Sequence, residues 1–96
     1  EKGFRDYFCD KLFLGVDGFD LDFGISTPSP EEAYLNQIMI DISKEVIVLA
    51  DSSKFERRGF AFIAPVSKIN IVITDKGIRP EYKSRLEATG IKVIVV

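Results

Sequence analysis

The chain has 96 residues, which is enough for one small domain with a single hydrophobic core and too few for two. Its formal net charge of -2 argues against direct binding of a polyanion such as DNA, and its apolar runs are far shorter than the roughly 20 residues of a membrane helix. The single cysteine excludes an internal disulfide and indicates a reducing compartment, and the lack of histidine excludes the common zinc sites. We therefore expect a cytoplasmic protein with no metal, cofactor or membrane partner.

Four short runs of mostly β-branched residues predict strands, at residues 11–16, 45–50, 69–74 and 92–96. Apolar and polar residues do not alternate in these runs, which is typical of strands with both faces covered. Helical segments between successive runs allow parallel pairing with right-handed crossovers. We therefore expect an α/β fold of the Rossmann-like kind, with a parallel sheet covered by helices.

Two helices are predicted between these strands. Ser29 can cap the first helix, Pro30 suits its first position, and Glu32 completes a capping box three residues after Ser29. An apolar stripe able to lie on a sheet follows at helical spacing, formed by Leu35, Ile38, Met39 and Ile42. The second helix is predicted from Pro80 to about Thr89. Residues 55–67 are predicted as a loop with a short helix, and residues 1–8 as a helix.

Polar residues follow three of the predicted strands. Ligands of open parallel sheets bind beyond the carboxyl ends of the strands. The aspartates at these ends are Asp17, Asp51 and Asp75. Lys54 lies on the loop after Asp51, and Glu32 lies in the first turn of the first helix, so we expect both at the same edge. Carboxylates that accept from hydroxyls, together with a cation, suit a small polyhydroxylated anion.

The same residues have simpler explanations, which the sequence leaves open. Each aspartate is equally well explained as a cap of the turn that follows it. Glu32 is equally well explained by the capping box, and Lys54 by an ordinary solvated lysine. The charged residues 56–58 are most simply explained as a solvated cluster, and contact with a phosphate or another domain is the alternative.

Three glycines, Gly15, Gly18 and Gly24, surround the end of the first predicted strand. They indicate a turn with close backbone approach, because their spacing is not the dinucleotide-binding fingerprint. Residues 20–24 have some features of a calcium loop. A glycine occupies the third ligand position, however, and the closing glutamate is missing, so we expect no metal site.

Several of these segments together resemble the sensor domain of DeoR-type transcriptional repressors. The matching segments are Cys9 to Gly18, Gly24 to Thr27, Glu31 to Ala33, Asn36, Met39, Ala50 to Phe55, Ile73 to Asp75 and Gly90 to Ile94. They span nearly the whole chain. Within the family, residues 14–17 and 35–36 are most similar to repressors of N-acetylgalactosamine and related amino-sugar operons.

The resemblance implies a fold shared with ribose-5-phosphate isomerase, glucosamine-6-phosphate deaminase and coenzyme A transferases, truncated at the N-terminus. Residues 1–96 would form a single, partial sensor domain, and a phosphorylated sugar would be the effector. Operator DNA would be bound by an N-terminal helix-turn-helix domain that this chain lacks. The sheet edge exposed by the missing first strand would favour a homo-oligomer.

The resemblance also implies which residues bind the effector. The matching positions are Asp10, Asp17, Gly18, Glu32, Asp51, Lys54 and Asp75. Of these, Asp17, Glu32 and Lys54 are the expected contacts to the sugar, and Asp10 is equally well explained as structural. No catalytic residue is expected. The alternatives are a sugar-phosphate isomerase or deaminase of the same fold, in which a carboxylate moves a proton, and a domain that serves only in oligomerisation.

Overall fold

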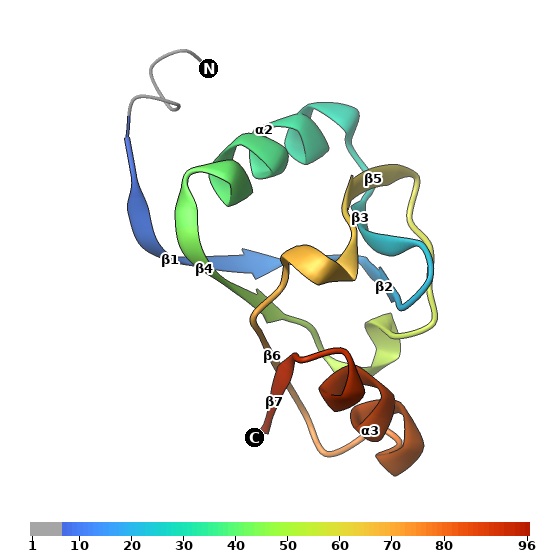
Figure 1. Ribbon diagram of the computed structural model, residues 1–96. Coiled ribbons are helices and arrows are strands. Elements are labelled where there is room, and N and C mark those ends of the chain that lie inside the picture. The colour runs from blue at the N-terminus through green and yellow to red at the C-terminus, as the bar shows by residue number, and fades with distance from the viewer. Residues whose placement is uncertain (1–6) are drawn as a thin grey trace.

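The computed structural model describes residues 7–96 of the chain. Two sheets and two α-helices make up the fold (Figure 1). Residues 1–6 lie outside the described part, and so does most of the helix predicted over residues 1–8. Tyr7 and Phe8, which are described, are in neither a helix nor a strand. Neither α-helix within residues 7–96 is long and apolar enough to cross a membrane.

The larger sheet has four parallel strands in the order β1-β4-β6-β7. Their bounds are Cys9–Gly15 for β1, Ser43–Leu49 for β4, Ile71–Thr74 for β6 and Lys92–Val95 for β7. Each strand overlaps one of the four predicted runs. The α/β class and the parallel sheet are therefore confirmed.

A second, antiparallel sheet was not predicted. It has the order β2-β3-β5, with bounds Gly18–Asp20, Gly24–Thr27 and Ala61–Ala64. The prediction of a loop with a short helix over residues 55–67 is therefore wrong for β5, although a 3₁₀ helix does follow at Val66–Lys68. Strand β5 forms because it pairs with β3, which lies more than thirty residues earlier in the chain.

Helix α2, Pro30–Asp41, begins where the sequence predicts. The Ser29 hydroxyl accepts a hydrogen bond of 3.3 Å from the backbone N–H of Glu32, as an N-cap does. The predicted apolar stripe is confirmed for Ile38 and Ile42, which are buried, and wrong for Leu35, which is 43% exposed. The helix also buries Ala33 and Ile40, which were not predicted.

Helix α3, Pro80–Ala88, agrees with its prediction to within one residue. It buries Tyr82 and Leu86, which lie one turn apart on the same face. Gly90 follows with a φ of 99°, a left-handed conformation that ends the helix.

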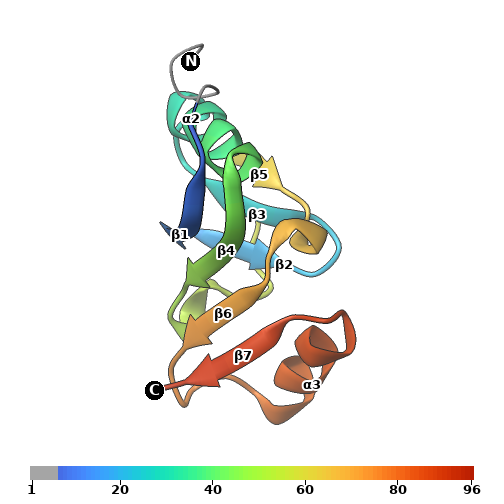
Figure 2. The same cartoon turned by 60° about the vertical axis from the view of Figure 1, so that its left-hand side comes forward.

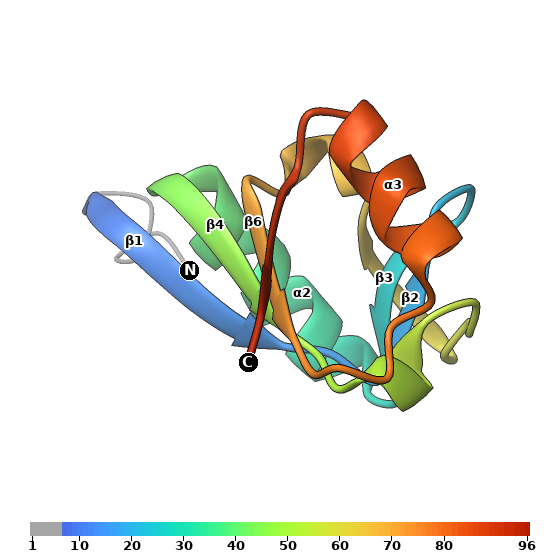
Figure 3. The same ribbon diagram turned by 90° about the horizontal axis from the view of Figure 1, so that it is seen from below.

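One hydrophobic core lies on one face of the parallel sheet. The sheet contributes Leu14 and Val48, α2 contributes Ile40, and the antiparallel sheet contributes Phe19. Figure 3 shows β2, β3 and α3 together on one side of the parallel sheet. The loops that follow β1 and β4 begin at the carboxyl ends of these strands.

The opposite face of the parallel sheet is partly open in residues 7–96. Phe13 on β1 and Leu49 on β4 point to this face and are 58% and 42% exposed, although Ile47 in its centre is buried. Figure 2 shows β4 and β6 with no helix in front of them. The sequence predicted cover on both faces, and the described residues provide it fully on only one.

Candidate functional site

A cavity of about 290 Å³ lies beyond the carboxyl ends of β1 and β4. Its lining residues are Asp17, Pro28, Lys54, Arg57, Arg58, Gly59 and Phe60. Three of these residues carry a positive charge and one a negative charge. The cavity is therefore a candidate site for an anionic ligand that also has hydroxyl groups.

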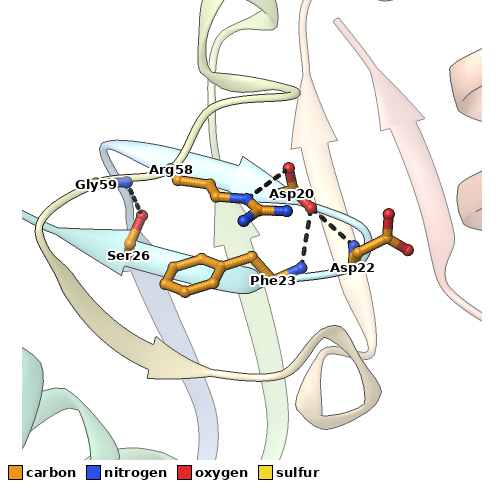
Figure 4. Close-up of polar contacts among 6 residues, drawn as sticks. All are labelled: Asp20, Asp22, Phe23, Ser26, Arg58 and Gly59. Atoms are coloured by element: carbon orange, nitrogen blue, oxygen red, sulfur yellow. Dashed lines mark hydrogen bonds and ion pairs between the residues drawn. The ribbon is translucent and has the colours of Figure 1, made fainter.

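The basic loop, which we define as residues 56–60, forms one wall of this cavity. Its backbone is fastened to the antiparallel sheet at two points. The N–H of Arg57 donates to the carbonyl oxygen of Phe19 over 3.3 Å. The N–H of Gly59 donates to the hydroxyl of Ser26 over 2.6 Å (Figure 4). The loop is thus held in place in the absence of a ligand.

Arg58 uses its guanidinium to anchor the basic loop. Its Nε lies 3.4 Å from a carboxylate oxygen of Asp20, and the guanidinium carbon lies 5.3 Å from the centre of the Phe23 ring. Figure 4 shows this side chain beside Asp20 and Phe23, at the other end of β2 and β3 from Gly59. The N–H of Phe23, followed by that of Asp22 and by Arg58 itself, lowers the pKa of the Asp20 carboxyl, so the pair is charged at neutral pH.

Arg57 differs from its neighbour because its side chain makes no hydrogen bond or ion pair within residues 7–96. Lys54, at the end of the 3₁₀ helix Ser52–Lys54, is only loosely paired, with its Nζ 3.9 Å from Asp51. Both side chains line the same cavity. These two cations are therefore available to a ligand, whereas Arg58 is engaged in holding the loop.

Of the neighbouring pair Asp17 and Gly18, only Asp17, which follows β1, lines the cavity. Gly18 is buried behind it, and a Cβ at this position would lie 2.7 Å from the carbonyl oxygen of Arg57. Gly18 therefore lets the basic loop pack directly against β2, and it has no contact with the cavity itself.

Glu32 lies next to the cavity without lining it. Its carboxylate accepts a hydrogen bond of 2.5 Å from the hydroxyl of Thr27, which ends β3. The predicted capping box is therefore only half formed, because the Glu32 side chain turns toward Thr27 and not back to the start of the helix. Pro28 between them belongs to the cavity wall.

Asp51 and Asp75 lie together and are not among the residues that line this cavity. Asp75 accepts from the backbone N–H groups of Ser52 over 2.9 Å and Gly77 over 2.8 Å, and Asp51 accepts from the hydroxyl and backbone N–H of Ser53. These bonds hold the pKa of both carboxyl groups below the usual value. Both aspartates border a second cavity of about 320 Å³, which is mostly apolar and includes Leu49, Ile73 and Val96.

Asp10 is placed apart from all of these residues. It is the second residue of β1, so it lies at the amino end of the sheet, whereas the cavity lies beyond the carboxyl ends. The structure thus brings Asp17 and Lys54 to the first cavity, places Gly18 and Glu32 beside it, and separates the other three candidates from it.

Arg57 is the site residue that the sequence reasoning did not select. The signal for it was two adjacent arginines shortly after Lys54. Adjacent arginines in a sequence have the same chemistry, and only the fold shows that one is bound to Asp20 while the other faces the cavity.

Comparison with known proteins identifies the family. Residues 1–76 match the DeoR C-terminal sensor domain. A putative aga operon transcriptional repressor of Escherichia coli O157:H7 is 40% identical over the whole chain, which covers 36% of that protein. The HTH-type transcriptional regulator GlpR of Haloferax volcanii is 33% identical over 88% of this chain and 33% of its own length.

A further relative is the HTH-type transcriptional repressor GlcR of Bacillus subtilis, which is 32% identical over 93% of this chain and 34% of its own length. The chain thus spans about a third of the length of these curated relatives. The match to the sensor domain, over residues 1–76, covers well over half of the chain. This chain therefore belongs to the DeoR family of transcriptional repressors, and it contains sequence of their C-terminal sensor domain.

Proposed function

We propose that this chain is the effector-binding part of a repressor of sugar catabolism and that its effector is a phosphorylated sugar. The observation that carries the proposal is that Lys54 and Arg57, two cations with little or no pairing, line one cavity with the carboxylate of Asp17. Arg and Lys side chains bind phosphate through charge-assisted hydrogen bonds, and a carboxylate accepts from sugar hydroxyls. The similarity of residues 14–17 and 35–36 to repressors of amino-sugar operons favours an amino sugar.

The size of the cavity agrees with a small ligand. Its volume of about 290 Å³ is at the lower end of the range of about 300–1,000 Å³ that is usual for small-molecule sites. Phe60 borders the cavity and is 82% exposed, so it offers an apolar surface to the ligand beside the charged groups. Of the predicted contacts, Glu32 does not line the cavity, and one of its carboxylate oxygens accepts from Thr27.

In this proposal the effector controls DNA binding from a distance. Operator DNA is bound by a helix-turn-helix domain outside this chain, in agreement with the net charge of -2. The effector shifts the population of a homo-oligomeric repressor away from the operator-binding state, which requires different affinities for the two states. Residues 1–96 act as one sensor domain in the cytoplasm. The curated relatives are transcriptional regulators, which favours a sensor over the alternative of an isomerase or deaminase.

Thermal unfolding against a panel of sugar phosphates tests the proposal. The panel contains hexosamine and tagatose phosphates, with the unphosphorylated sugars as controls. A ligand at 100 times its Kd should add about 2.7 kcal/mol to the free energy of unfolding. Stabilisation by one phosphorylated sugar, lost in Arg57→Ala and kept in the exposed control Lys68→Ala, is the expected result. Equal stabilisation of both variants, or none of the wild type, would refute the site.

A further inference from the structure

We propose that Ser26 is a positioning residue that sets the anion affinity of the cavity without touching the ligand. This inference rests on the proposed function, because it concerns the same cavity. Ser26 lies in β3 with no exposed surface and is not among the lining residues. Its hydroxyl oxygen accepts the N–H of Gly59, which does line the cavity.

The packing around Ser26 shows why a small residue with an acceptor is needed there. A Cβ on Gly18 would lie 2.5 Å from the Ser26 hydroxyl oxygen, and a Cβ on Gly59 would lie 2.8 Å from it. Backbone therefore packs directly on this hydroxyl from two sides. Alanine at this position would leave the Gly59 N–H without its acceptor, and a larger side chain would push the basic loop outward.

Ser26 acts on the ligand through Arg57. The Arg57 side chain has no partner within residues 7–96, so its position depends on how the backbone around it is held. Two bonds hold that backbone, one from Arg57 itself to Phe19 and one from Gly59 to Ser26. The bond at Ser26 is the shorter of the two, and its acceptor is fully buried.

The other anchors of the basic loop are weaker. The ion pair of Arg58 with Asp20 and that of Glu56 with Arg79 both involve arginines that are more than half exposed. Exposed ion pairs contribute little because water and salt screen them. The hydroxyl of Ser26 is thus the main anchor at the end of the loop that meets the cavity.

The test measures the affinity of the 96-residue chain for inorganic phosphate and for glucosamine 6-phosphate by calorimetry. We expect Ser26→Ala to weaken the binding of both probes by about three- to tenfold. This is the size of effect expected when one hydrogen bond that holds the basic loop in its binding position is lost. The matched control is Ser43→Ala, because the Ser43 hydroxyl bonds the Met39 carbonyl at the opposite end of the sheet. This control should lose stability without losing affinity.

A double-mutant cycle separates positioning from a general loss of stability. If Ser26 acts through Arg57, then Ser26→Ala should cause no further loss of affinity in an Arg57→Ala background. Gly18→Ala should mimic Ser26→Ala, because the added methyl group displaces the loop directly. An equal loss in both backgrounds, or no loss in either Ser26→Ala or Gly18→Ala, would overturn the inference.

Hydrogen exchange of the Gly59 amide keeps the inference testable if the variants do not fold. The amide should be protected in the wild-type chain without ligand, since its acceptor is buried. Exchange at the rate of an unprotected amide would overturn the inference. Wild-type chain that binds neither probe nor any sugar phosphate would refute the proposed function itself, whereas wild-type affinity in Ser26→Ala would refute only the role of Ser26.

Discussion

The backbone N–H of Ser52, just after β4, donates a hydrogen bond of 2.9 Å to the carboxylate of Asp75, at the end of β6. This bond joins the loops that follow two neighbouring strands. It also explains how a carboxylate predicted as a ligand contact is used within the fold. Asp75 accepts from Gly77 as well, so its charge is already satisfied by two backbone groups.

This pairing predicts how stability depends on pH. The N–H groups of Ser52 and Gly77 lower the pKa of the Asp75 carboxyl below the ordinary value of an aspartate. A carboxyl group with a lowered folded-state pKa stabilises the fold above the unfolded pKa, and this contribution is lost as the pH falls through the folded-state value. Asp75→Asn should therefore reduce the free energy of unfolding at pH 7 and flatten its decline below pH 4.

Urea denaturation at pH 7 and at several pH values below 4 measures this effect. Asp10→Asn is the control, because the Asp10 carboxylate accepts no hydrogen bond within residues 7–96. If the two variants have the same dependence on pH, the bonds to Asp75 do not stabilise the fold.

The two neighbouring arginines should behave differently when they are replaced. Arg57→Ala should weaken the binding of a phosphorylated sugar by on the order of 10- to 100-fold, because a hydrogen bond from a charged donor is lost. Its melting temperature without ligand should stay close to that of the wild type, since the side chain has no partner in residues 7–96. Arg58→Ala should show the opposite pattern, with a small loss of stability and little change in affinity. Equal losses of affinity in both variants would contradict this division.

The sequence was sufficient for elements that depend on local signals. The start of α2 was predicted because Ser29 and Pro30 are start signals that act within one turn. The parallel strands were predicted because their short runs are rich in β-branched residues. Strand β5 was not predicted, because it has only one β-branched residue, Ile63, and pairs with β3, far away in the chain.

For the candidate site, too, the sequence indicates some of the residues and not others. Asp17 lies just after β1 and Lys54 lies in the loop that follows β4, so the rule for carboxyl ends places both near the cavity. Asp51 follows the same rule, yet it caps the turn after β4. A sequence pattern cannot distinguish a carboxylate that caps a turn from one that meets a ligand, because the distinction depends on which backbone N–H groups the loop presents. Arg57 could be placed at the cavity only from the fold of the basic loop.

The bond between Thr27 and Glu32 should couple the end of β3 to the start of α2. Thr27 is 3% exposed and donates its hydroxyl to the Glu32 carboxylate. Thr27→Val keeps the shape of the side chain but removes this donor, so we expect a loss of about 1–2 kcal/mol in the free energy of unfolding. Glu32→Gln keeps an acceptor and should lose less. Urea denaturation compares the two, and a larger loss in Glu32→Gln would contradict the role given to this bond.

The partly open face of the parallel sheet should cause self-association of this chain. Phe13 and Leu49 expose apolar surface there, and exposed apolar patches favour association. Phe13→Ser should reduce the dimer fraction in sedimentation velocity at high micromolar concentration, while changing the free energy of unfolding by less than about 1 kcal/mol.

Leu14→Ala, on the buried face of the same strand, is the matched control. It should cost about 2–5 kcal/mol of stability and leave the dimer fraction of the folded chain unchanged. Self-association that Phe13→Ser does not alter would indicate that chains meet at the free edge of β1 and not at this face, since edge pairing uses backbone groups that the substitution leaves intact.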